Sequence, residues 1–319
     1  MALLVTGAAG HVGQWVARRA AAEGRRVVAT YRGGNKPEDA ASPGGDIAWA
    51  QCDLTDAAEV DKLAAEHAID SCIHLAAVSN EAFARPQPLA AVQANIGATA
   101  NLLDAAQRRN WRRFVLVGTG SVFQNADAVT PILEDMQPSP AGIYATTKHC
   151  AELLTGMYRS QFGLSAATVR ISWVYGPPVA TDSLTRGPIP AFLRAALAGV
   201  PRCDSGGADF AASFTYVADA ADGLITAANA NRLSHDVYHL GSGVNYTAGQ
   251  VASAVRRAVP GAVIELGPGT EPWTTHTKMR GPLTGDRLRT DTGYGVRYSL
   301  EAGIAEYADW LRANAGAYR

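Results

Sequence analysis

Short, uninterrupted apolar runs alternate with longer amphipathic stretches through the first half of the chain. Runs that are apolar without alternation are typical of parallel strands, because such strands are buried on both faces. The stretches between them are long enough for helices, and the alternation predicts an α/β fold with a doubly wound parallel sheet. Strands are expected at residues 2–5, 26–32, 47–52, 70–74, 113–119 and 165–171.

The character of the sequence changes after Gly176. Residues 176–190 are rich in Pro, Gly, Ser and Thr, which predicts a loop, and residues 190–199 look helical. The apolar pattern of the sheet returns near Phe214 and again at residues 238–240. A ligand is expected in a cleft beyond the strand ends. We expect a larger domain, a smaller discontinuous α/β lobe and a C-terminal helix, formed respectively by residues 1–175 with 213–242, by 176–212 with 243–298, and by 299–319.

A glycine-rich turn follows the first expected strand. Residues Thr6 to Gly13 lie between the apolar run and a helix-prone stretch that ends near Gly24. Strand, glycine turn and helix in this order are the context in which such a fingerprint binds a dinucleotide, with the phosphates at the helix N-terminus. An ordinary glycine-rich turn is the alternative. The turn therefore predicts a Rossmann domain, which would be the larger domain of this chain.

The second expected strand ends in Tyr31-Arg32. Domains that select NAD usually carry Asp or Glu at this point, where the acid accepts hydrogen bonds from the ribose hydroxyls. Neither acid is present here, and the guanidinium of Arg32 is suited to a 2′-phosphate. NADP(H) is therefore the favoured cofactor. NAD(H) is the alternative, and Arg32 would then be a solvated surface residue.

Tyr144 and Lys148 are four residues apart in a stretch with helical character. On a helix they lie on one face, one turn from each other. A phenol ionises at about pH 10, and a neighbouring ammonium favours the phenolate. The pair therefore predicts a general acid/base, Tyr144, whose pKa is lowered by Lys148. A chance Tyr-x-x-x-Lys pair in an ordinary helix is the alternative.

Composition narrows the range of partners. The 319 residues are 47% hydrophobic and 18% charged, with a formal net charge of −1, which is typical of a globular protein with a full core. Without a basic excess or a long apolar run, neither nucleic acid nor membrane is expected as a partner. The first strand begins at Ala2, so no signal peptide is expected. Four widely spaced cysteines fit a reducing cytoplasm, and seven histidines lack ligand spacing, so we expect a cytoplasmic protein without a metal site.

These segments resemble the extended branch of the short-chain dehydrogenase/reductase superfamily, the NAD-dependent epimerase/dehydratase family, along nearly the whole chain. Thr6 to Gly13 matches its TGxxGxxG loop, Arg170 to Pro177 its Arg-x-x-x-Val-Tyr-Gly-Pro junction, and Ser299 to Ile304 the start of its C-terminal helix. The resemblance implies that the cofactor is bound by the glycine loop and by several later segments. The implied residues are Gly7, Ala9, Gly10, His11, Val12, Gly13, Arg32, Asp53, Leu54, Leu75, Ala76, Ala77, Asn95, Tyr144 and Lys148.

The resemblance also implies a catalytic set. Aligning the expected strand at residues 113–119 places Thr119 where the family has its catalytic hydroxyl, with Ser121 as the alternative. Thr119 would hold the substrate oxygen, while Tyr144 moves the proton and Lys148 holds the nicotinamide ribose. A strand-end threonine that only bonds backbone is the other interpretation of Thr119. Substrate contacts are expected from Ser121, Val174, Arg186 and Arg280.

Departures from the family pattern narrow the chemistry. The dehydratases carry Asp and Glu directly after the catalytic Thr, where this chain has Gly120 and Ser121, so water elimination lacks its proton carriers. The C3/C5 epimerase-reductases use a Cys and a His where this chain has Ser121 and Pro178. Nucleotide-sugar enzymes commonly clamp the diphosphate with an Arg where this chain has Ala212. Whether another arginine replaces that clamp stays open, and the candidates are Arg186, Arg194 and Arg280.

The expected function is an oxidoreductase that transfers a hydride between NADP(H) and a secondary alcohol or ketone of a polar, sugar-like substrate. Arg32, Ala212 and a resemblance of residues 28–32 to NADPH-dependent carbonyl reductases favour this over the alternative, a nucleotide-sugar 4-epimerase with tightly bound NAD. A non-catalytic, cofactor-sensing regulator is a third hypothesis, disfavoured because Tyr144 and Lys148 are both present.

A homodimer is also expected. Long apolar stripes run along the predicted helices at residues 89–109 and 141–162. Packing against the sheet is one explanation of these stripes. In the family that this chain resembles, the same pair of helices often forms a four-helix interface between two subunits, which favours the dimer.

Overall fold

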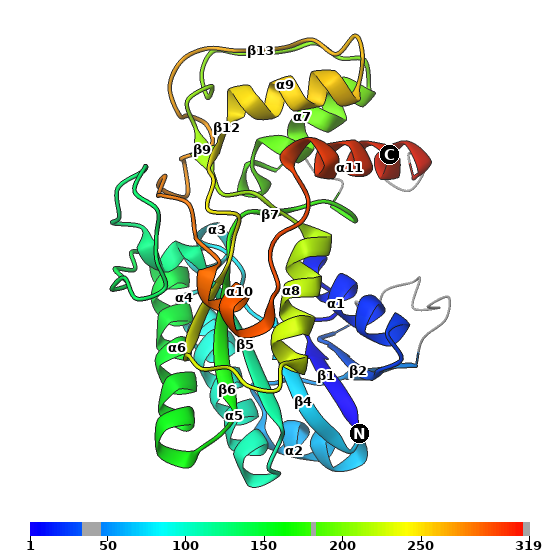
Figure 1. The fold of residues 1–319 in the computed structure, drawn as a ribbon, viewed down its shortest axis with the longest axis vertical. Helices are drawn as coiled ribbons and strands as arrows, with labels where there is room; N and C mark the ends of the chain where they lie inside the picture. The colour runs from blue at the N-terminus through cyan, green and yellow to red at the C-terminus, as the bar shows by residue number, and fades with distance from the viewer. Residues whose placement is uncertain (34–45, 180–182, 315–319) are drawn as a thin grey trace.

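The computed structural model describes residues 1–33, 46–179 and 183–314. The parts of the predicted domain, lobe and C-terminal helix that fall at 34–45, 180–182 and 315–319 lie outside the described residues. The chain forms a parallel sheet flanked by helices, with a smaller lobe beyond the carboxyl ends of the strands (Figure 1). No helix in the described part of the chain is long and apolar enough to cross a membrane.

Seven parallel strands make up the main sheet, in the order β11-β6-β5-β4-β1-β2-β3. The predicted doubly wound sheet is confirmed. Its strand order reverses between β1 and β4, which is where ligands bind in such sheets. The strands are β1 (Ala2–Thr6), β2 (Arg26–Tyr31), β3 (Ile47–Gln51), β4 (Ile69–His74), β5 (Arg113–Thr119), β6 (Ala166–Ile171) and β11 (Val237–Leu240).

Helices cover both faces of this sheet, which explains why its strands are apolar without alternation. Leu3 and Val5 of β1 belong to the core beneath α1 (His11–Ala22) and α8 (Val217–Asn229). Ala2 and Leu4 point the other way, because successive side chains of a strand lie on opposite faces, and they belong to the second core. That core also receives side chains of α2 (Ala57–Glu66), α5 (Ala98–Arg108) and α6 (Ile143–Phe162).

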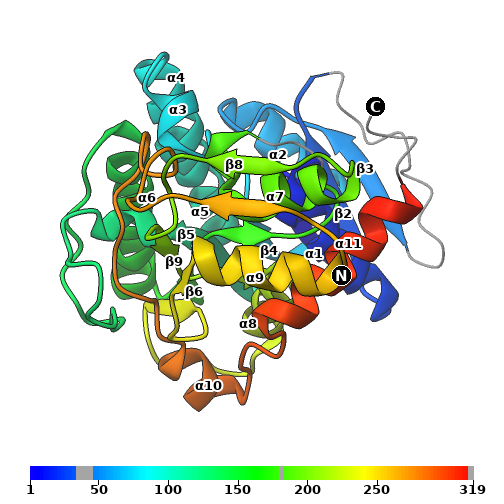
Figure 2. The ribbon, with the colours of Figure 1, turned by 90° about the horizontal axis from the view of Figure 1, so that it is seen from above.

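The smaller lobe is built around α7 (Pro188–Leu197) and α9 (Ala248–Ala258), with β8 (Arg202–Asp204) and β13 (Ile264–Leu266) paired side by side (Figure 2). Its core is rich in aromatic side chains, including Phe192, Phe210 and Trp273. Three further helices and two single turns connect the larger elements. The remaining elements are β7 (Val174–Tyr175), β9 (Ala211–Ala212), β10 (Thr215–Tyr216), β12 (Tyr246–Thr247), α3 (Glu81–Ala84), α4 (Pro88–Val92), a π-helix (Gln93–Gly97) and two 3-10 turns (Gly120–Phe123 and Leu184–Arg186).

The helix before the last does not follow the predicted division of the chain. The helix α10 (Asp286–Thr292) packs against β11 and α8, although residues 243–298 were expected in the smaller lobe. Its Leu288 is buried in the core on the α1 side of the sheet, which anchors the helix there. In contrast, α11 (Leu300–Ala313) packs against α9 and α7, so it covers the lobe.

Candidate active site

A cavity of about 680 Å³ lies where the carboxyl ends of the strands meet the smaller lobe. Side chains from the glycine loop, the strand ends, the first turns of α6 and the lobe loops line it. Its volume is in the range of small-molecule and cofactor sites. Nearly all the site residues expected from the sequence meet here: Gly7, Ala9, Gly10, His11, Val12, Gly13, Arg32, Asp53, Leu54, Leu75, Ala76, Ala77, Thr119, Ser121, Tyr144, Lys148, Val174, Arg186 and Arg280.

The turn between β1 and α1 fits a dinucleotide. A Cβ atom on Gly13 would lie 2.2 Å from the carbonyl oxygen of Gly7, so only glycine lets the helix approach the strand this closely. The N-cap position, Gly10, makes no side-chain capping bond, which leaves the first amides of α1 to a ligand. These donors suit a pyrophosphate. Beside them, burial and the charge of Arg186 lower the pKa of His11 to about 3, so its imidazole is neutral.

Thr6 joins the glycine loop to the segment that follows β4. Its Oγ1 accepts hydrogen bonds from the amides of Leu75 (3.1 Å) and Ala76 (3.2 Å) and lies 2.7 Å from Nδ1 of His74. Because the Thr6 hydroxyl oxygen accepts hydrogen bonds from two amides, its own proton is donated to Nδ1 of His74. His74 is 1% exposed, and its Nε2 lies 3.1 Å from Oγ1 of Thr99. His74 is therefore a packed residue at the end of β4.

Asn95 is missing from the described residues that line the cavity, and the prediction that it contacts the cofactor is corrected here. The side chain is 1% exposed. Its Oδ1 accepts from the amide of Val78 at 2.8 Å, and its Nδ2 donates to Oγ1 of Thr147 at 2.9 Å. Asn95 thus ties the loop after β4 to α6. The π-helical turn that contains Asn95 lies against α6, and contacts within the protein use both ends of the amide.

The start of α6 is held by Glu81, a residue that the sequence did not single out. The Glu81 carboxylate accepts hydrogen bonds from the amides of Ile143 (3.3 Å) and Tyr144 (3.0 Å), which caps the helix and neutralises its N-terminal dipole. The N-cap residue is Gly142, with φ 86°, and a Cβ atom there would lie 2.6 Å from the carboxylate. Because Glu81 is 62 residues from Ile143, no local sequence signal connects them.

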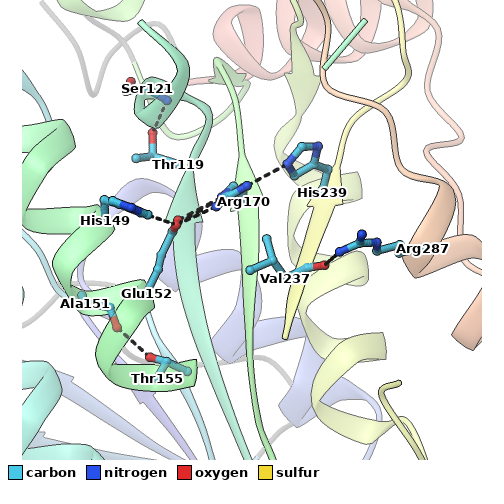
Figure 3. A network of polar contacts seen from close by, with 10 residues as sticks. All are labelled: Thr119, Ser121, His149, Ala151, Glu152, Thr155, Arg170, Val237, His239 and Arg287. Atoms are coloured by element: carbon cyan, nitrogen blue, oxygen red, sulfur yellow. Dashed lines mark hydrogen bonds and ion pairs between the residues drawn. The ribbon is translucent and has the colours of Figure 1, made fainter. Parts of the chain in front are cut away.

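Thr119 and Tyr144 meet at the end of β5. The Oγ1 of Thr119 accepts the amide of Ser121 at 3.1 Å (Figure 3), and the hydroxyl lies close enough to the phenol of Tyr144 to affect its pKa. Burial raises the pKa of Tyr144 above its usual value, against the Thr119 hydrogen bond and the charge of Arg280, which both lower it. The predicted direction is therefore wrong for the site as described. Desolvation dominates this shift, and the cation that opposes it is Arg280.

Lys148 lies one turn further along α6 and is 3% exposed. Burial lowers its pKa to about 8, and the carboxylate of Glu152 opposes that shift. Lys148 therefore carries its charge at neutral pH and loses it in mildly alkaline solution. Glu152 is the next residue on the same face of the helix, so the line Tyr144, Lys148, Glu152 runs from the cavity into the protein interior.

Behind Lys148, Glu152 forms a buried ion pair with Arg170 of β6 (Figure 3). The Nη2 of Arg170 donates to Oε2 at 2.9 Å and its Nε to Oε1 at 3.1 Å, while Nη1 lies 3.3 Å from Nε2 of His239. Burial alone would raise the pKa of Glu152, but hydrogen bonds from His149 and Arg170 lower it overall. Burial and the Arg170 charge lower the pKa of His239 to about 3, so this imidazole is a neutral acceptor.

Three arginines were candidates to replace a phosphate clamp at position 212. Ala212 itself is 4% exposed in the apolar core of the smaller lobe, away from the cavity. Arg186 and Arg280 line the cavity, whereas Arg194, on α7, does not. The cavity therefore has two guanidinium groups on its lobe side.

Ser172 and Trp173 also line the cavity, although they were not proposed as site residues. They lie inside the Arg-x-x-x-Val-Tyr-Gly-Pro junction, which was the available signal. Trp173 has φ 39°, and its ring packs edge-on against Phe210 at 5.4 Å. It therefore ties the cavity wall to the aromatic core of the lobe.

Several known proteins are similar to this chain over most of its length. A UDP-glucose 4-epimerase from Mycolicibacterium smegmatis is 27% identical over 315 residues, which are 98% of this chain and 99% of that protein. A UDP-glucuronate 4-epimerase from Thermodesulfobacterium geofontis is 30% identical over 256 residues, 76% of this chain and 75% of that protein. The solved structure of MoeE5 in complex with UDP-glucose and NAD is 25% identical with a TM-score of 0.83, covering 99% of this chain and 100% of that chain. The sequence profile of the NAD dependent epimerase/dehydratase family matches residues 3–241, which confirms the expected resemblance: the chain belongs to that family.

Proposed function

We propose that this protein transfers a hydride between a nicotinamide dinucleotide and a secondary alcohol carbon of a sugar-like substrate. The observation that carries the proposal is the meeting of Thr119, Tyr144 and Lys148 in the same cavity as the glycine loop. The loop supplies donors for a pyrophosphate, and the three side chains supply a proton carrier, a hydroxyl and a cation.

Each of the three side chains has a role in this proposal. When bound, the nicotinamide ring accepts a hydride from the alcohol carbon and gives it back. Tyr144 exchanges the proton of the substrate hydroxyl, and its raised pKa means that the phenol is protonated at neutral pH, ready to donate to a carbonyl oxygen. Thr119 has one lone pair engaged by the Ser121 amide, so its own proton is directed toward Tyr144 and the substrate oxygen. Lys148, a cation below about pH 8, is assigned to the nicotinamide ribose.

The first candidate is a nucleotide-sugar epimerase with retained NAD. The relatives support it, because two of them are 4-epimerases named for UDP-sugars and MoeE5 was solved with UDP-glucose and NAD. An epimerase takes a hydride from one face of a carbon and returns it to the other, so its cofactor stays bound between the two steps. Arg186 and Arg280 are the groups on the lobe side that are suited to a diphosphate or another anion.

A reductase that exchanges NADP(H) at each turnover is the second candidate, and two observations favour it. Arg32 lines the cavity at the end of β2, where no acid is present; the pKa of nearby Asp53 is lowered mainly by hydrogen bonds from Thr55, and the charge of Arg32 adds a smaller contribution in the same direction. Ala212 is buried in the lobe core, so position 212 offers no clamp for a diphosphate.

Cofactor titrations separate these candidates. NAD⁺ and NADP⁺ are titrated into the native protein and into Arg32→Ala, with Arg18→Ala on the exposed face of α1 as the matched control. A reductase of the second kind prefers NADP⁺ and loses that preference only in Arg32→Ala. An epimerase interconverts UDP-glucose and its C4 epimer with the cofactor that it already holds. If the protein supports neither reaction and oxidises or reduces no sugar substrate with either cofactor, the hydride-transfer proposal fails.

We also propose a homodimer that is formed by α4 and α6, which lie side by side at one edge of the molecule (Figure 1). Leu89 at the start of α4 is 69% exposed and Leu153 in α6 is 61% exposed. Such exposed leucines on adjacent helices suit a helix-to-helix interface. Light scattering of Leu153→Glu should then give a monomer. Val129→Glu, at an even more exposed apolar position in a loop, should leave the dimer intact.

A further inference from the structure

We infer that the substrate carries a carboxylate close to the carbon whose hydroxyl is oxidised, and that Arg280 binds this carboxylate. The identity of that carbon rests on the hydride transfer proposed above. The charge of the ligand rests on Arg280 alone, and on how this side chain is buried.

Arg280 is a buried cation without a counter-ion. It is 7% exposed, and its Nη2 donates to Oγ of Ser172 at 3.3 Å. Its Nη1 is buried without a hydrogen-bond partner, and within residues 1–33, 46–179 and 183–314 no carboxylate forms an ion pair with it. A guanidinium has five N–H donors, and leaving the two on Nη1 buried without an acceptor is unfavourable. An anion in the cavity would satisfy them.

The backbone of Arg280 holds the side chain in this position. Its carbonyl oxygen accepts from Nδ2 of Asn245 at 2.7 Å, and Leu283, three residues later, is fully buried beside Val122, Phe123 and Ile132. The guanidinium is therefore presented by an anchored segment. Burial lowers its pKa to about 10, so the group remains charged at neutral pH.

The position of the guanidinium identifies the part of the substrate that it contacts. A Cβ atom on Gly120 would lie 3.3 Å from Nε and 3.5 Å from Nη2 of Arg280, so the guanidinium lies over the backbone directly after Thr119. Its charge also lowers the pKa of Tyr144. In the proposed function, Thr119 and Tyr144 both contact the reacting hydroxyl of the substrate. Arg280 therefore contacts a substrate group that is only one or two carbons from that hydroxyl. Residue 120 leaves room for the guanidinium because it is glycine.

A carboxylate suits this position better than a diphosphate. The planar fork of arginine pairs with a carboxylate through two parallel hydrogen bonds, and Nη1 and Nη2 form one such edge. The diphosphate of a nucleotide sugar is separated from the reacting carbon by most of the sugar ring. Arg186, which lines the same cavity, is the other guanidinium available for that more distant group. The inferred substrate class is therefore a sugar acid, free or as the sugar of a nucleotide.

Binding measurements with matched probes test the inference. UDP-glucuronate is compared with UDP-glucose, and gluconate with glucitol, by calorimetry on the native protein loaded with NAD⁺, with UDP alone as the phosphate arm. The acid of at least one pair should bind about tenfold tighter than its neutral partner. Arg280→Gln should abolish this preference, and Arg280→Lys, which retains the charge but loses the fork, should retain part of it. Arg194→Gln, an arginine of the same lobe outside the cavity, is the control and should bind like the native protein.

Three results would overturn the inference. The first is equal affinity for acid and neutral partner in both pairs, and the second is a native protein that binds none of the four sugar probes. The third is a loss of UDP affinity in Arg280→Gln as large as the loss for UDP-glucuronate, which would assign the guanidinium to phosphate. If Arg280→Gln does not fold, Arg280→Lys carries the test alone, by lowering the acid preference. Because these titrations measure binding, absence of hydride transfer would refute the proposed function and leave a carboxylate preference standing.

Discussion

Arg170 and Arg280 are both buried arginines, and the difference between their surroundings separates the part of the molecule that holds the fold from the part that receives a ligand. Arg170 is 3% exposed and is bound by Glu152 and His239. Arg280 is 7% exposed and is bound by one hydroxyl, with Nη1 left unpaired. A compensated charge stabilises the protein around it, whereas an uncompensated one is costly until an anion arrives.

The two arginines lie on opposite sides of Tyr144 and Lys148. Along one face of α6, Glu152 lies one helical turn from Lys148 on the side of the protein interior. Tyr144 lies one turn from Lys148 on the side of the cavity, where the charge of Arg280 acts on its pKa. Substitutions behind Lys148 should therefore change stability, and substitutions in front of it should change chemistry or binding.

The largest effect is expected from Tyr144→Phe, on the cavity side. Removing the phenol oxygen deletes the proton carrier, so turnover should fall by roughly two to four orders of magnitude, while stability and cofactor binding stay close to native. Steady-state rates together with a urea titration measure both. Tyr158→Phe makes the same change lower on α6, where the ring packs against Phe162 outside the cavity, and should keep full activity. Near-native turnover in Tyr144→Phe would show that Tyr144 is not the proton carrier.

Glu152→Ala should have the largest effect on stability. It leaves Arg170 buried without its counter-ion, and breaking such a pair from one side costs about 3–5 kcal/mol of unfolding free energy. Denaturant titration measures this loss. Glu301→Ala removes an acid that pairs with Arg257 at 2.9 Å on the surface, where both side chains are more than half exposed, and should cost less than about 1 kcal/mol. Equal losses of unfolding free energy in the two variants would show that the buried ion pair contributes no more to stability than the exposed one.

Lys148 should make stability depend on pH in a defined direction. Its pKa is about 8 in the folded protein, below the value of about 10.4 expected in an unfolded chain. Between these values the unfolded chain binds more protons, so the contribution of Lys148 to the unfolding free energy rises with pH, by at most about 1.4 kcal/mol per pH unit. Below about pH 8 both states are protonated and the contribution is constant.

The difference between the native protein and Lys148→Met isolates this contribution, because all other titrating groups are shared. Unfolding free energies at several pH values from 7 to 10 should show the native protein gaining on the variant only in the alkaline half of the range. Parallel curves throughout would mean that burial does not lower the pKa of Lys148. A native protein that loses stability relative to the variant would show a shift of the opposite sign.

The smallest effect, and the sharpest contrast with Glu152→Ala, is expected from Arg280→Met. Methionine fills a similar volume without a charge, so removal of an uncompensated cation should leave the unfolding free energy unchanged or raise it by about 1 kcal/mol. The same urea titration detects this change. A loss as large as that of Glu152→Ala would mean that Arg280 is structural like Arg170, and the distinction between the two regions would disappear.

The sequence by itself determined the features that depend on short-range geometry. The turn between β1 and α1 could be predicted from the order of strand, glycine turn and helix between Ala2 and Ala22. Contacts within that turn are what require glycine at positions 7 and 13. The spacing of Tyr144 and Lys148 was sufficient to place both on one face of α6. The uniformly apolar strand segments were sufficient to predict a sheet that is covered by helices on both faces.

Only the tertiary structure decided what depends on distant contacts and on burial. Glu81 caps α6 from 62 residues away, Asn95 turns from the cavity toward Val78 and Thr147, and α10 packs on the sheet through Leu288. Burial also reversed the expected direction of the Tyr144 pKa and left Nη1 of Arg280 without a hydrogen-bond partner among the described residues. Desolvation and pairing are set by which chain segments surround a group, and that arrangement exists only once strands and loops far apart in the sequence have come together.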